Sequence, residues 1–492
     1  MNYASPESKG ISSESIHKYI ETLEKFRIAL HSVIIARGND IVYEQYWEPF
    51  HADFLHRIYS SSKSIVALAV GFAEQDGLLN LDDPMSKYFA KELEGQEDLN
   101  MHEQTVRHML MMSTCKPQEN WFVRRPEDRV HLYFQNPNTH LTRPSGTLFE
   151  YDSTGSFVLG ALVERLTGKP MMEYLKEKFM RRIGVSEDVY CLTCPGGHAW
   201  GDSGVMFRAT DFLKVARFVL NKGRWDGEQL LNEEFVTAAT SKQIHNDMTD
   251  AGTYCRQGYG YLFWMTYNNA FCFLGMGSQI AICVPEKDMI LIVNGDTHQG
   301  APVPECTIAD RFFDLVVDTA QDEPLPENPA AQAKLNVERK LITAVGDNYV
   351  PFQDKIDGVT FEMNENRMGI TKFSLHFDGE GHGRFDYTNA QGDKSIPFGM
   401  CENVFDKFPQ EGYSDDVGGM RTKGFYYDCA ASAAWVEPQK LFLKVQIIDR
   451  YFGRLDITLG FRDENRVGVW MVKHAEDFLN EYAGFAEGRA KE

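Results

Sequence analysis

The chain has 492 residues, more than one hydrophobic core usually serves, so we expect two domains. Its 71 acidic and 50 basic residues give a formal net charge of −21, which repels a nucleic-acid backbone and an anionic membrane surface alike. No stretch approaches the roughly 18 uncharged apolar residues of a membrane-spanning helix. Neither nucleic acid nor a membrane is therefore an expected partner.

The N-terminus and the cysteines bear on the compartment. Residues 1–10 show neither the basic cluster nor the apolar core of a secretory signal. The nine cysteines are odd in number and scattered along the chain, which fits reduced thiols better than a disulfide framework. Both observations favour a cytoplasmic protein.

The first part of the chain opens with a helix and a hairpin. Residues 13–26 have the apolar spacing of a helix, and residues 32–36 and 41–44 have the pattern of two paired strands. A long amphipathic helix follows Tyr59 and ends at Gly77. This mixture of helices and antiparallel strands indicates an α+β fold.

A long loop and three further elements complete this part. Residues 115–146 are polar, aromatic and proline-bearing, and they are too numerous for an ordinary connection. We expect them to cover a site, with Trp121 facing the substrate. The remaining expected elements are a helix over 156–166, a strand pair over 271–284 and 289–294, and a helix over 304–320.

The composition changes near residue 322. Residues 321–330 include three prolines and cannot continue a helix, which predicts a linker over 322–335 between domains at 1–321 and 336–492. Short alternating strands then dominate, which predicts a β-rich second domain with a barrel as its candidate architecture. Four such strands are at 359–363, 373–377, 441–447 and 467–471.

A serine and a lysine at the start of one helix are the first candidate catalytic pair. Ser60 and Lys63 are three residues apart, so they lie on the same helical face, one turn from each other. A serine hydroxyl becomes a nucleophile when a base takes its proton, and a lysine whose pKa is lowered can be that base. Alone the motif is weak, because a serine-rich helix start followed by a solvated lysine is also the ordinary N-cap pattern.

Further motifs give this pair a context. They are Phe149-Glu-Tyr-Asp-Ser153, Gly258-Tyr-Gly-Tyr-Leu-Phe-Trp264 and Gly275-Met-Gly-Ser-Gln279. With Ser60 to Lys63, their order and spacing resemble the beta-lactamase superfamily of serine hydrolases over about residues 5–320. The resemblance is to the branch of class C beta-lactamases, D-alanyl-D-alanine carboxypeptidases, carboxylesterases and 6-aminohexanoate-dimer hydrolases, and is greatest for the last.

The resemblance implies a role for each matching residue. Ser60 would be the nucleophile, Lys63 its base, and Tyr151 the group that relays a proton to the leaving group. Ser153 stands where the family has asparagine, and a hydroxyl there can still hydrogen-bond a substrate. Tyr151 alone would more often be a half-buried aromatic with a wet hydroxyl.

The family's third motif, Lys-Thr-Gly or His-x-Gly, aligns with residues 273–275 and lacks its cation here. The backbone N–H groups of Ser60 and Met276 would form the oxyanion hole, with Gly275 contacting the substrate. Beta-lactamases and carboxypeptidases use that cation near the substrate carboxylate. Its loss argues against both activities.

The resemblance implies a beta-lactamase/transpeptidase-like first domain, with an antiparallel sheet flanked by helices, that hydrolyses an ester or amide of a small molecule or short peptide. A peptidase or amidase for D-amino-acid substrates is one alternative. A binding protein that has kept the fold and lost turnover is another.

No metal or cofactor is expected. Cys191 and Cys194 have the spacing of half a zinc site, but no second pair of ligands follows. His298, after the last strand pair, is expected to be a loop histidine and not a general base.

Overall fold

The computed structural model describes residues 1–116, 128–135, 142–194, 196–249, 251–298, 303–411, 424–476 and 478–491. It divides into two compact units, Met1–Lys340 and Leu341–Glu492. Residues 322–335, where the sequence predicts a linker, lie in the first unit. Helix α11 (Pro329–Leu335) packs there against α1 (Ser13–Lys25), and Gln332 donates a hydrogen bond of 2.7 Å to Glu7.

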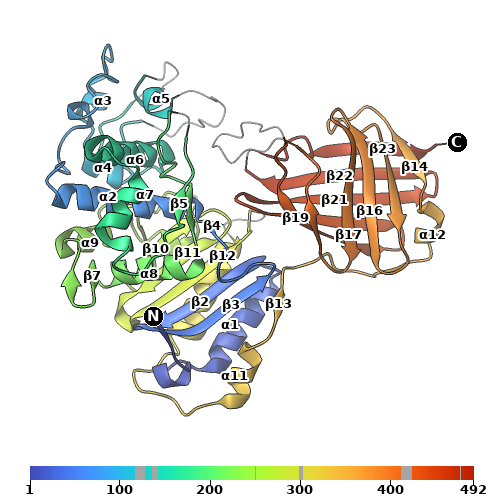
Figure 1. The fold of residues 1–492 in the computed structure, drawn as a ribbon, viewed down its shortest axis with the longest axis horizontal. Helices are drawn as coiled ribbons and strands as arrows, with labels where there is room; N and C mark the ends of the chain where they lie inside the picture. The colour runs from blue at the N-terminus through green and yellow to red at the C-terminus, as the bar shows by residue number, and fades with distance from the viewer. Residues whose placement is uncertain are drawn as a thin grey trace. The chain divides into compact units, whose positions relative to one another are not determined.

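The first unit is built on one largely antiparallel sheet (Figure 1). Its strands lie in the order β1 (Asn2–Tyr3), β3 (Asp40–Glu48), β2 (Leu30–Arg37), β12 (Met289–Gly295), β11 (Gln279–Val284), β10 (Phe271–Gly275) and β9 (Trp264–Met265), and β13 (Arg339–Lys340) pairs with β3. Strands β11 and β12 are buried along their whole length. Strands of this kind need cover on both faces.

Helices supply that cover. Helix α8 (Ala209–Leu220) packs on β2, β11 and β12, and α1 lies on the opposite side of the sheet with α11 (Figure 1). The predicted helix at 304–320 is α10 (Val303–Phe312) followed by the π-helical turn η8 (Phe313–Val317), and both pack against α1. The α+β fold predicted from the sequence is confirmed.

Helix α2 (Ser62–Gln75) is the buried centre of a helical layer beside the sheet. All of its residues from Ser62 to Ala73 are buried, and it packs against α6 (Ser153–Thr167). Helices apolar on every side lie inside a protein, so the start of α2 is held from all directions. The part of this unit that the structure describes also contains the α-helices α3 (Leu99–Glu103), α4 (Val106–Leu110), α5 (Arg129–Gln135), α7 (Met171–Leu175) and α9 (Glu233–Ala239).

Two short strand groups complete the first unit. They are a sheet of β4 (His56–Arg57), β6 (Val205–Phe207) and β5 (Tyr190–Cys191), and a hairpin of β7 (Arg224–Trp225) and β8 (Glu228–Gln229). Among the described residues no helix has the length and hydropathy that a membrane span requires.

The predicted strand over 271–284 is instead two strands. Gly277 and Ser278 have φ values of 76° and 69°, in the left-handed region, and they form a turn between β10 and β11. Gly277, Ser278 and Gln279 interrupt the apolar residues here, so the sequence did carry a turn signal that the single predicted strand passed over. We call residues 275–278 the β10–β11 turn.

The second unit is a closed barrel of nine strands. The strands run in the order β17 (Gly392–Met400), β16 (His382–Asn389), β15 (Lys372–Phe377), β14 (Thr360–Met363), β23 (Gly484–Ala490), β22 (Arg466–Ala475), β21 (Phe452–Asp463), β20 (Lys440–Ile448) and β19 (Asp428–Glu437). Pairing of β17 with β19 closes the ring, β18 (Val404–Lys407) adds to β19, and α12 (Gln353–Ile356) precedes the barrel strands. The predicted β-rich architecture is therefore confirmed.

We expect Trp435 to be a main stabilising side chain of the barrel. It is 1% exposed and its indole N–H donates a hydrogen bond of 3.0 Å to Gln353. Trp435→Ala should lower the free energy of unfolding by about 3–5 kcal/mol, as for other buried aromatic truncations. Trp470→Ala, at a side chain that is 48% exposed, should cost less than about 1 kcal/mol. Chemical unfolding of the full chain followed by circular dichroism compares the two, and equal losses would contradict the assignment.

Candidate active site

Ser60 lies in a tight turn that the surrounding strands hold in place. The turn is the 3-10 helix η2 (Tyr59–Ser61), which leads directly into α2. Ile58 donates its backbone N–H to Val205 at 2.9 Å, and the Ser61 hydroxyl donates to the Gln279 carbonyl at 2.7 Å. Ser60 is therefore fixed between β6 and β11.

The residue before Ser60 has an unusual backbone that a buried cation supports. Tyr59 has a φ of 46°, a conformation that costs a non-glycine residue free energy. The buried guanidinium of Arg57 lies between the rings of Tyr59, at 4.0 Å, and Trp200, at 4.1 Å. It also donates hydrogen bonds to the backbone and side chain of Ser203. These contacts hold the Tyr59 ring and hence the direction of the Ser60 turn.

Lys63 meets Ser60 as the motif predicts. Its Nζ is 3.0 Å from Ser60 Oγ and donates a second hydrogen bond, of 2.7 Å, to the backbone oxygen of Asp202. The lysine is only 2% exposed. A proton can pass directly between the serine hydroxyl and the amine at this distance.

Asp202 is a residue of this site that the sequence analysis missed. Its carboxyl is buried, and Oδ1 has no hydrogen-bond partner among the described residues. Burial raises the pKa of Asp202, while the charges of Lys63 and Arg129 oppose the shift. Asp202 lies between Gly201 and Gly204 in the sequence, but which side chains of this segment are buried could not be read from it.

Tyr151 lies beside the amine of Lys63. Lys63 Nζ is 5.0 Å from the centre of the Tyr151 ring, which stacks on Trp264 with centroids 5.5 Å apart. Asp152 caps α6 by accepting the Gly155 N–H at 2.9 Å, so the residues before the helix are fixed. Ser153 is the first residue of α6, two positions after Tyr151.

The β10–β11 turn approaches the Ser60 turn closely enough to require glycine. A Cβ atom on Gly275 would lie 2.2 Å from the backbone oxygen of Ile58. Only glycine therefore allows the end of β10 to reach η2. The next residue, Met276, is 42% exposed.

Two further sequence predictions concern Trp121 and the Cys191–Cys194 pair. Trp121 lies outside the residues that the structure describes, as do 117–127 and 136–141 of the predicted covering loop. Cys194 accepts a hydrogen bond from Arg129 at 3.2 Å. Within the described ranges, no cluster of His, Cys, Asp and Glu is arranged to hold a metal ion.

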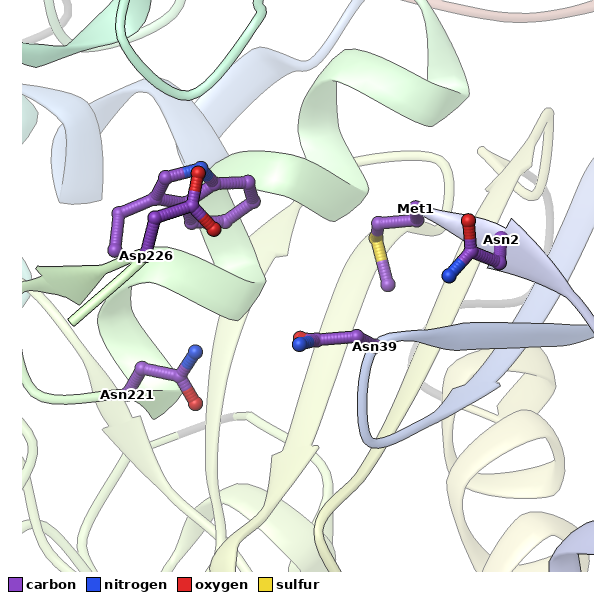
Figure 2. Close-up of a pocket in the computed structure, with 6 residues that line it drawn as sticks. Met1, Asn2, Asn39, Asn221 and Asp226 are labelled. Carbon is purple, nitrogen blue, oxygen red and sulfur yellow. The ribbon is translucent and has the colours of Figure 1, made fainter.

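A surface pocket of about 200 Å³ lies elsewhere in the first unit. The residues that line it are Met1, Asn2, Asn39, Asn221, Trp225 and Asp226 (Figure 2). None of these residues is a predicted catalytic group, so we assign no chemistry to it.

The fold and the Ser60 site define the class of protein. The beta-lactamase family model matches residues 21–310, and the chain belongs to this family, as the motifs indicated. It is 25% identical over 279 residues to 6-aminohexanoate-dimer hydrolase of Paenarthrobacter ureafaciens, across 53% of this chain and 70% of that protein.

Solved structures add similarity of fold. EstCE1, titled a hydrolase with promiscuous acyltransferase activity, has a TM-score of 0.50 and 16% identity, covering 61% of this chain and 99% of its own. SurE with D-Leu has a TM-score of 0.50 and 16% identity, covering 87% of this chain and 97% of its own. The second similarity extends well beyond the family model's residues.

Glu305 should make the stability of the protein depend on pH. This residue of α10 is buried, which raises its pKa from the ordinary value of 4.5 to about 7, although His298 and the Ser278 N–H oppose the shift. The folded state holds the proton more tightly, so stability falls as pH rises from about 4.5 to 7. Glu305→Gln should be more stable than the native protein at pH 8 by about 3 kcal/mol, and equally stable at pH 4.

Thermal unfolding across this pH range measures the difference. The exposed Glu365→Gln is the matched control and should leave the profile unchanged. A Glu305→Gln profile parallel to that of the native protein would contradict the expectation.

Proposed function

We propose that the protein is a serine hydrolase that cleaves an ester or amide bond through an acyl-enzyme on Ser60. The observation that carries this proposal is the 3.0 Å contact between Lys63 Nζ and Ser60 Oγ in a chain of the beta-lactamase family. Lys63 takes the hydroxyl proton as Oγ attacks the substrate carbonyl carbon. The carbonyl π bond opens and its oxygen becomes the oxyanion.

The backbone N–H groups of Ser60 and Met276 would hold that oxyanion. The close approach of Gly275 to Ile58 supports this role, because it fixes the β10–β11 turn against the Ser60 turn. Donors that are fixed before the reaction need no reorganisation as charge develops, which is their main catalytic advantage.

Tyr151 and Lys63 would protonate the leaving group as the bond between it and the substrate carbonyl carbon breaks. The 5.0 Å separation between Lys63 Nζ and the Tyr151 ring centre supports a shared proton path. Water then attacks the acyl-enzyme and releases Ser60 and the acid. Ser153, Gly275 and Trp121 are the proposed substrate contacts, and the substrate is a small molecule or short peptide.

The absence of the family's cation from β10 supports a substrate that binds without a contact from its carboxylate. Phe273 occupies that place in the aligned motif, and its ring is fully buried against Phe212 and Phe263. Strand β10, Phe271–Gly275, contains no lysine, arginine or histidine. This favours ester or amide hydrolysis over beta-lactamase or carboxypeptidase activity.

A second candidate is an amidase or peptidase for D-amino-acid substrates. It is favoured by the similarity to SurE, a protein whose structure was solved with D-Leu and whose likeness covers 87% of this chain. We also propose a cytoplasmic location, which the nine free cysteines support.

Labelling with a fluorophosphonate probe tests the proposal. Mass spectrometry should locate one adduct at Ser60 in the native protein. Ser60→Ala should abolish labelling and Lys63→Ala should slow it at least about 100-fold, because the serine loses its base. Lys355→Ala, at an exposed lysine of the second unit, is the control and should label at the native rate. Folded native protein that resists labelling would instead favour a binding protein that has kept the fold.

The choice of leaving group tests Tyr151. Nitrophenolate is a stable anion and leaves without gaining a proton. The nitrogen of an anilide must instead gain a proton as its bond to the carbonyl carbon breaks. Tyr151→Phe should therefore reduce kcat for a nitroanilide by about 100-fold or more and kcat for the matching nitrophenyl ester much less. Equal losses on the two substrates would remove Tyr151 from the proton path.

A further inference from the structure

Three ionisable side chains lie behind the β10–β11 turn and have no part in the mechanism above. His298 Nδ1 is 2.5 Å from Asp296 Oδ1, and the two side chains are 4% and 8% exposed. Glu305 of α10 faces the same pair, and its carboxyl accepts the backbone N–H of Ser278. Burying a histidine and a carboxyl group together costs desolvation free energy, so their place in the fold calls for a physical reason.

The imidazole of His298 packs against both segments that hold the proposed oxyanion donors. Its ring centre is 5.5 Å from that of Tyr59, the residue before Ser60. A Cβ atom on Gly277, the residue after Met276, would lie 2.8 Å from His298 Cε1. The buried ring of His298 therefore contacts the sequence neighbour of each proposed donor, Tyr59 before Ser60 and Gly277 after Met276.

The β10–β11 turn is tied to the segment that carries His298. Thr297 donates its N–H to the Gly277 oxygen at 3.3 Å, and its hydroxyl is 2.6 Å from that of Ser278. The buried amide of Gln279 donates to the oxygens of Gly277 and Gly295. These bonds fix the distance between the imidazole and the turn.

We propose that His298, as an imidazolium paired with Asp296, is a positioning residue that stabilises the oxyanion through the β10–β11 turn. The inference rests on the proposed hydrolase function and assigns to His298 the positive charge that the third motif lacks on β10. His298 does not touch the substrate. It acts as the positive end of a fixed dipole, in a region of low dielectric where such a dipole has a large effect.

The surrounding charges are consistent with one cation at this place. His31 of β2 also faces His298, and it is 3.1 Å from His56. Burial lowers the pKa of His31 well below its usual value and that of His56 to about 3, so both are neutral. His298 instead has the carboxyl group of Asp296 as its neighbour, at 2.5 Å. The raised pKa of Glu305 keeps this second carboxyl protonated below about pH 7.

His298→Asn is the first test, because its amide can still donate to Asp296 but carries no charge. We expect kcat/KM for a nitrophenyl ester to fall at least about tenfold with KM changed less than twofold, and labelling of Ser60 by the fluorophosphonate to slow by the same factor. The control is His245→Asn, which alters an exposed His–Asp pair with a spacing of 2.8 Å to Asp247. It should leave both rates unchanged.

The outcomes separate the two proposals. Native protein that labels at Ser60, with His298→Asn equally fast, overturns the role of His298 and leaves the hydrolase function standing. Native protein that does not label at Ser60 overturns both.

Asp296→Asn provides a second measurement should His298→Asn fail to fold. Without the carboxylate the imidazolium loses its proton more readily, so the alkaline fall of kcat/KM should begin at lower pH than in the native protein. A merely structural role would reduce activity without moving the profile, and an unmoved profile therefore overturns the proposal.

Discussion

The approach of the end of β10 to the turn before α2 is the constraint on which the rest of the first unit depends. Gly275 and Ile58 come so close that a single methyl group would collide with a backbone oxygen. Two segments more than 200 residues apart in the chain are thereby joined at the point where Ser60 begins its helix. The sheet, the buried helix α2 and the tie from Ser61 to Gln279 all maintain this contact.

Buried charge is concentrated around the same contact. Arg57 and Lys63 are both buried there, and each is satisfied by hydrogen bonds or aromatic faces. Asp202 has a carboxyl oxygen that lacks a hydrogen-bond partner among the described residues. Such groups raise the free energy of the folded state. They are therefore retained where function needs them, which is why they cluster at sites of chemistry. The fold supplies the stability that this arrangement costs.

The parts of the site that were predictable from the sequence are those set by local geometry. Ser60 and Lys63 meet because residues three apart share a helical face. The sequence prediction joined β10 and β11 into one strand. The two glycines and Ser278 between them signalled a turn, but glycine also occurs within strands, so only the paired register of the structure separates the two elements. Asp202 and His298 reach the site through long-range packing, which leaves no local pattern.

The barrel shows a similar limit. The alternating strand pattern indicated a β-rich unit. The residue at which the first unit ends depends instead on long-range packing between segments, which the sequence pattern does not show. Prolines in 321–330 signalled a break in helical structure, yet the following helix α11 packs back on α1 and the division falls after Lys340. Composition located the end of an element, not the end of a compact unit.

The order of strands in the barrel has a consequence for synthesis. β23, the last strand along the chain, lies between β14 and β22, two strands that are separated by about a hundred residues. Until β23 emerges from the ribosome, both of these neighbours present an unpaired edge. The ring can therefore close only after translation of nearly the whole unit, whereas the first unit is complete much earlier. The first unit can fold while the barrel is still an open sheet.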